Sequence, residues 1–219
     1  SFLPPSEPLR TIRAEGFELI YPESAELQAQ RAANALDWMH SELSKELHVP
    51  PHPIPVILNN QVTLGNGFVG FLPYRSAWFL SPIDGNPLVF GSSATWLEQL
   101  ALHEYRHVVQ GEQSLQSGAF WMYLVFGETG WALVNNLSQP PWYCEGDAVA
   151  VETMFSLTGR GRSPGFSAEL AALYDEKGVL HAENMIHGSL KEPVPDHYRM
   201  GWLMVRYGLL KHGPDFWTK

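Results

Sequence analysis

Cysteine is nearly absent from this sequence, which has one, Cys144, in 219 residues. A single thiol excludes a disulfide framework within the chain, but it leaves the compartment open because many exported proteins lack disulfides. Clusters of lysine and arginine are also missing, and 14 basic against 23 acidic residues give a net charge of −9. Without a basic patch there is no sign of a nucleic-acid-binding surface, so we expect no nucleic-acid partner.

Long apolar runs are missing as well. A membrane-spanning helix needs about 18 or more consecutive apolar residues, and the nearest run, Ala119 to Phe126, stops at Gly127-Glu128. We therefore expect no transmembrane segment. The first residues lack the charged and apolar regions of a signal peptide. Ser1-Phe2-Leu3-Pro4-Pro5 resembles the start of a chain from which such a peptide has been removed. The last residues carry no stop feature, so we expect a piece of a longer protein.

Apolar residues, in contrast, make up 45% of the chain, and charged residues only 17%. This composition supplies a hydrophobic core and argues against a disordered chain. Eight Trp and eleven Phe indicate a core rich in aromatic side chains. The length suits one domain, which can be built from two lobes.

Strand patterns come first and helix patterns follow, which favours an α+β fold. Apolar alternation and short apolar runs predict strands over 11–21, 54–58 and 77–80, with a loop or irregular hairpin over 59–70. Helical spacing predicts helices over 23–48, 95–110, 142–158, 167–177 and 196–211. Thr95 and Asp196 are the expected N-caps, and Pro140-Pro141 is expected to start the helix over 142–158. Gly111 is expected just past a helix end. We expect a strand-rich lobe with one long helix over 1–94, an aromatic-rich connector over 112–139, and a helical lobe carrying the metal site over 95–219.

One short motif carries recognisable chemistry. His103-Glu104-Tyr105-Arg106-His107 is an H-E-x-x-H sequence on a predicted helix. At 100° per residue the two histidines lie about 40° apart on one face, so both imidazoles can bind one ion. Glu104 beside them can take a proton from a metal-activated water. Random placement gives roughly 0.03 matches to this motif in such a chain, and the apolar helix around it favours a metal over two ordinary core histidines.

A catalytic zinc needs a third protein ligand and an open position. Glu145, near the start of a predicted helix, is the best candidate, because Gly146 after it lets that helix approach another backbone closely. The alternative is a first-turn glutamate favoured by the helix dipole. Beside the H-E-x-x-H helix we favour the ligand.

His103-Glu104-x-x-His107 together with Trp142-Tyr143-x-Glu145-Gly146-x-Ala148 resembles the gluzincin metallopeptidases. The resemblance is closest to the bacterial branch often fused to a Tol-type β-propeller, and it extends over most of the chain. It implies a Zn²⁺ cofactor, peptide hydrolysis and a periplasmic or envelope location. It also implies a zincin-like fold, with a sheet-containing N-terminal lobe, a helical C-terminal lobe and the active-site cleft between them. The implied partners are a peptide or protein substrate and a fused C-terminal propeller.

The resemblance also suggests supporting residues. The strand before the active helix binds substrate as an added strand in such enzymes, and Ala77, Trp78, Phe79 and Leu80 match it. An oxyanion donor is expected near the start of the last helix, where Tyr198 is preferred over His197. Arg106 departs from the small or uncharged residue usual at its position, and we expect it to form a salt bridge at the helix edge.

Metal-binding histidines usually donate their second N–H to a carboxylate or carbonyl. Asp147 and Glu152 are candidates for that role, and the alternative is that both are solvated acidic residues. Six further histidines show no ligand spacing and are expected to be ordinary surface or loop residues: His40, His48, His52, His181, His187 and His212.

Two functions from different classes fit the sequence. The first is an endopeptidase, because no motif for capturing a substrate terminus is present. The second is a catalytically silent binding module that keeps the metallopeptidase fold and docks a propeller or another protein. Glu104 favours the enzyme, since a scaffold has no use for a base beside the metal.

Overall fold

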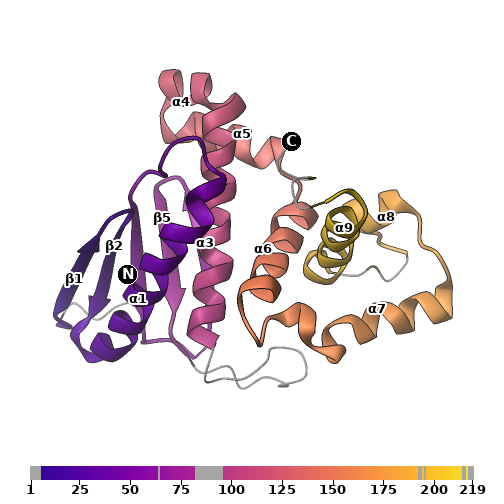
Figure 1. The fold of residues 1–219 in the computed structure, drawn as a ribbon, viewed down its shortest axis with the longest axis horizontal. Helices are drawn as coiled ribbons and strands as arrows, with labels where there is room; N and C mark the ends of the chain where they lie inside the picture. The colour runs from indigo at the N-terminus through magenta and orange to yellow at the C-terminus, as the bar shows by residue number, and fades with distance from the viewer. Residues whose placement is uncertain are drawn as a thin grey trace. The chain divides into compact units, whose positions relative to one another are not determined.

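The structure, a computed structural model, describes residues 6–63, 65–81, 96–191, 194, 196–213 and 216 (Figure 1). These residues form two units, one ending at Ser138 and the other starting at Gln139. The first contains a five-stranded mixed sheet with helices and the second is helical, so the expected α+β class is confirmed. Among the described residues, no helix is both long and apolar enough to cross a membrane.

The sheet of the first unit has the strand order β1-β2-β3-β5-β4. The strands are β1 Leu9–Ala14, β2 Phe17–Pro22, β3 Ile54–Asn59, β4 Asn66–Phe71 and β5 Tyr74–Phe79. β2, β3 and β5 run parallel, whereas β1 and β4 pair antiparallel with their neighbours and form the two edges. The strand expected over 11–21 is thus a hairpin, which turns at Gly16 with φ +81°, and the segment expected to be irregular contains β4.

One face of this sheet forms the core of the first unit. In register, Leu19 lies beside Val56 and Val56 beside Ser76, and all three are buried. Residues that alternate with them are only partly buried, as the period of two along a strand requires. Apolar residues of helix α1, among them Leu36 and Met39, are buried as well.

The helices of the first unit extend well past the expected boundary at residue 94. They are η1 Glu23–Ala25, α1 Glu26–Leu43, η2 Ser44–Glu46, α3 Trp96–Ser114, the π-helical turn η4 Leu115–Ala119, α4 Phe120–Phe126 and α5 Glu128–Ser138. The H-E-x-x-H helix α3 packs against α1 and β4, so it groups with the sheet and not with the later helices. The expected cap Thr95 lies outside the described residues.

Gly111 does not end the H-E-x-x-H helix, contrary to the sequence prediction. It lies inside α3, where a Cβ atom would collide with the ring of Phe71 on β4. Glycine is therefore present because the helix and the strand approach closely there. The helical path continues through η4 into α4, and the expected connector is mostly helical.

The second unit consists of helices. They are α6 Pro141–Phe155, η5 Arg160–Arg162, α7 Pro164–Lys177, α8 Ala182–His187 and α9 His197–His212. Two predicted start signals are confirmed: Pro141 is the first residue of α6, and the Asp196 side chain accepts a hydrogen bond of 2.8 Å from the backbone N–H of Arg199. α8 was not predicted, and α6 ends at Phe155, before the expected Thr158.

Candidate metal centre

The two histidines of the H-E-x-x-H motif face each other on α3. Their Nε2 atoms lie 3.1 Å apart, and the ring planes are nearly perpendicular at 88°. Two nitrogens that bind one zinc tetrahedrally at about 2.0–2.1 Å lie about 3.3 Å from each other. The pair therefore has nearly the spacing of metal ligands, which the helical repeat of four residues had predicted.

A residue missed by the sequence analysis orients one of these rings. The side-chain oxygen of Gln110 lies 2.9 Å from Nδ1 of His107. An amide oxygen only accepts hydrogen bonds, so this contact favours the tautomer with the proton on Nδ1, in which Nε2 is the nitrogen that can bind a metal. This is the arrangement that a metal-binding histidine needs. Gln110 follows His107 by three residues, which puts the two on one face of α3, and that spacing was the available signal.

Glu104 is buried on α3, 3% exposed. Its side chain passes directly over Gly67 on the edge strand β4, where an added Cβ atom would lie 2.9 Å from both Cγ and Oε1 of Glu104. The proposed base is therefore confined between its own helix and the edge of the sheet. Gly67 was not singled out from the sequence, because only the strand pairing brings it to this helix.

The predicted salt bridge of Arg106 is confirmed. The guanidinium pairs with the carboxylate of Glu46 in η2, and its side chain is only 6% exposed. The charge of Arg106 is thus balanced by a carboxylate of the same unit. Next to it in sequence, Tyr105 is buried, and burial raises the pKa of its hydroxyl to about 12.

Two of the histidines expected to be ordinary surface or loop residues also have structural partners. Nδ1 of His40 is hydrogen-bonded at 2.8 Å to the hydroxyl of Tyr105. His52 binds the fully buried carboxylate of Glu112 through its backbone N–H and its ring Nδ1, each at 3.1 Å. Both contacts join residues 60 or more positions apart in sequence, so no local pattern could have shown them.

In the second unit, Glu145 lies in the first half of α6 and is partly buried. The next residue, Gly146, packs backbone to backbone against Gly201 of α9, and a Cβ atom at either position would overlap the other helix. The predicted reason for Gly146, a close helix approach, is thus confirmed. With His103 and His107, Glu145 makes up a group of three side chains that could hold a metal ion.

Glu152, which was expected to support a histidine, forms an ion pair with Arg160 of its own unit. Both of its carboxylate oxygens accept hydrogen bonds from Arg160, one of them at 3.0 Å from Nε. The same guanidinium lies 4.9 Å from the centre of the Tyr198 ring, in the first turn of α9. Glu152 and Arg160 therefore hold the candidate oxyanion donor from one side. Asp147 is buried on α6, 6% exposed, and its predicted support of a histidine stays a prediction.

The single thiol, Cys144, precedes Glu145 on α6 and is partly buried. Burial, followed by the nearby charges of Glu145 and Asp147, raises the pKa of Cys144 to about 12. A thiol with this pKa is protonated at neutral pH, whereas both metal binding and nucleophilic attack require the thiolate.

The strand predicted to bind substrate cannot accept an added strand. β5, which contains Ala77, Trp78 and Phe79, is paired with β3 on one side and β4 on the other. Trp78 is also a core side chain, 1% exposed, with its indole N–H bound to Ser76. The edge strand beside α3 is β4, whose Gly67 lies against Glu104. The sequence could not reveal which strand of the β4–β5 hairpin pairs with β3 and which one lies at the edge.

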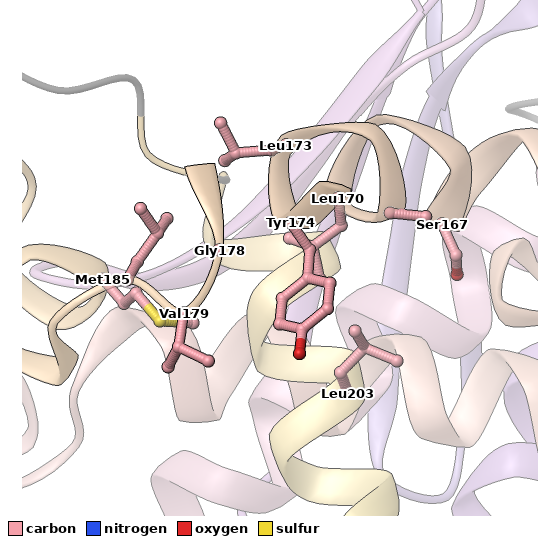
Figure 2. Close-up of a pocket in the computed structure, with 10 residues that line it drawn as sticks. Ser167, Leu170, Leu173, Tyr174, Gly178, Val179, Met185 and Leu203 are labelled. Atoms are coloured by element: carbon pink, nitrogen blue, oxygen red, sulfur yellow. The ribbon is translucent and has the colours of Figure 1, made fainter. Parts of the chain in front are cut away.

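A pocket of about 380 Å³ in the second unit has no part in this chemistry (Figure 2). It lies between α7, α9 and the segment that leads to α8, and it is lined by apolar side chains such as Leu170, Val179, Met185 and Leu203. Tyr174 is the one titratable residue of its lining. None of the candidate metal or catalytic residues lines it.

The chain was compared with known proteins at three levels. No protein-family model, no curated protein and no solved structure matches it. The resemblance to gluzincins therefore rests on the two sequence motifs alone.

Proposed function

We propose that this chain is a zinc-dependent endopeptidase of gluzincin type, with a zincin-like division into two lobes. The observation that carries the proposal is the pair His103 and His107, whose Nε2 atoms face each other while Gln110 accepts the Nδ1 proton of His107. Two imidazoles and the carboxylate of Glu145 are a donor set typical of catalytic zinc, which keeps one position open. The buried Glu104 beside them supports a catalytic centre over a purely structural one.

When bound, zinc would act as a Lewis acid towards a water molecule and the scissile carbonyl. Glu104 would accept the proton of the attacking water and pass it to the leaving amine. The substrate backbone would lie along the edge strand β4, because an edge strand offers free backbone groups to an extended peptide. β4 thus replaces Ala77 to Phe79 in the proposal, and it would hold the peptide next to Glu104.

Tyr198 is the proposed donor to the oxyanion that forms during hydrolysis. Arg160 contacts one face of its ring, and Glu152 fixes Arg160 in turn. We expect Tyr198→Phe to lower kcat by about 10²–10³-fold with little change in KM, because the hydroxyl acts only in the transition state. Steady-state kinetics on a peptide substrate measures this, and an unchanged kcat would move the role to His197.

An envelope location and a fused propeller are further parts of the proposal and rest on the motif resemblance alone. The alternative is a silent binding module with the same fold. The binding module predicts the same zinc content as the peptidase but no hydrolysis of peptides. Zinc content and hydrolysis therefore have to be measured together.

The deciding experiment is Glu104→Gln. The substitution keeps the size of the side chain but removes the proton acceptor, so hydrolysis of a peptide library should fall by about 10²–10⁴-fold. Zinc content should remain at about one per chain, because Glu104 is not a proposed ligand. Zinc is measured by elemental analysis and cleavage by mass spectrometry.

The same substitution at Glu128 on α5 is the matched control, and it should leave both quantities unchanged. Loss of zinc in Glu104→Gln would mean that this residue holds the site together. Zinc-loaded wild type that cleaves no member of the library would favour the binding module.

A further inference from the structure

The hairpin formed by α4 and α5 exposes an unusual amount of apolar surface. Its outer residues, named here the apolar tip, are Phe120, Trp121, Leu124, Val125, Phe126, Leu133 and Leu137. Each is between 49% and 79% exposed, and no residue of α4 is buried. The hairpin follows the C-terminal end of α3 in the first unit (Figure 1). An exposed apolar cluster of this extent indicates a binding surface.

The hairpin is fixed to its unit by a different set of side chains. Trp131 on α5 is 2% exposed, packs between Phe71 and Tyr74, and donates its indole N–H to the carbonyl of Gly111 at 3.1 Å. Leu115 and Ala119 complete this small core. The apolar tip is thus not needed to hold the hairpin in place.

We propose that the apolar tip inserts into the surface of a lipid bilayer. The exposed apolar positions of α4 spread over roughly 240° of its circumference, whereas docking into a protein groove uses one stripe of a helix. A helix with apolar residues around most of its circumference requires an apolar medium on all of those sides, and the acyl chains of a bilayer supply one. α4 is about 10 Å long at 1.5 Å per residue, so it is too short to cross a hydrocarbon core of about 30 Å and can only enter its surface.

Charge supports the same partner. Residues 113–127 contain no charged side chain, and Glu128 is the only one in 113–138. The complement of such a surface is the uncharged interior of a membrane, and Trp and Phe are typical of its boundary. The hairpin has no lysine or arginine for anionic lipids, and the chain carries a net charge of −9. Binding should therefore occur on zwitterionic lipid and depend little on salt.

The test is co-sedimentation of the whole chain with phosphatidylcholine vesicles. We expect wild type to sediment with the vesicles to the same extent, within twofold, at low and high sodium chloride, because no charge pair contributes to binding. The triple variant Trp121→Ser, Leu124→Ser and Val125→Ser should bind at least tenfold more weakly. Circular dichroism and the melting temperature confirm that it folds.

The control replaces three apolar residues outside the hairpin that are even more exposed, Leu157, Val179 and Leu190, by serine. It should bind vesicles like wild type. The proposal is overturned if wild type stays in the supernatant or if the two triple variants bind equally. It is also overturned if wild type forms a dimer that only the tip variant abolishes and that does not bind vesicles, since the tip would then contact a second copy.

Discussion

At the scale of single residues, Gln110 decides how the H-E-x-x-H pair can act. A histidine binds a metal through one nitrogen only if the proton stays on the other, and Gln110 holds that proton on Nδ1 of His107. The sequence favours acidic residues for this support, because carboxylates are common partners of metal-binding histidines. The nearer partner is an amide one turn along the same helix.

Gln110→Leu is expected to weaken zinc binding by about 10–100-fold, because the tautomer and ring orientation of His107 are no longer fixed. Competition with a fluorescent chelator measures the affinity. Gln110→Glu keeps an acceptor at the same place and should retain zinc within a few-fold. If the Leu variant binds zinc as tightly as the Glu variant, Gln110 has no part in the site.

At the scale of secondary-structure elements, the approach of β4 to α3 shapes the space around Glu104. Gly67 and Gly111 each permit a close contact between this strand and this helix, one beside Glu104 and one beside Phe71. Neither glycine has a positive φ, so both are explained by packing and not by backbone conformation. A sequence pattern cannot distinguish these two uses of glycine, which is why Gly111 was taken for a helix end.

Gly67→Ala should displace the Glu104 side chain, since the new methyl group would lie 2.9 Å from its Cγ and Oε1. We expect peptide hydrolysis to fall at least tenfold with zinc content unchanged, because small displacements of a catalytic group cost much of its effect. Gly70→Ala on the same strand is the control, since its nearest neighbour would be 3.7 Å away. Equal activity of the two variants would contradict the proposed position of the base.

At the scale of the whole molecule, the proposed ligands come from both units. His103 and His107 belong to the unit that contains the sheet, whereas Glu145 belongs to the helical unit. The lobe boundary expected at residue 94 would have placed all three in one lobe. α3 instead packs against α1 and β4, because it continues into a hairpin whose Trp131 is buried beside Phe71 and Tyr74.

Glu145→Ala should remove most of the bound zinc while both units remain folded. Added zinc should raise the melting temperature of wild type, because a ligand that binds only the folded state stabilises it, and this rise should disappear in the variant. Glu176→Ala, which changes an exposed glutamate of the same unit, is the control. Full zinc content in Glu145→Ala, measured by elemental analysis, would show that the third ligand is another residue.

Sequence alone determined the features that depend on neighbours along the chain. The H-E-x-x-H spacing, the start of α6 at Pro141 and the cap at Asp196 all follow from the geometry of a single helix. Tertiary structure alone decided features that depend on distant segments. It made β4 the edge strand, paired Glu152 with Arg160, and required glycine at positions 67 and 111. Strand order and close packing arise from contacts between residues far apart in sequence, and a local pattern carries no information about them.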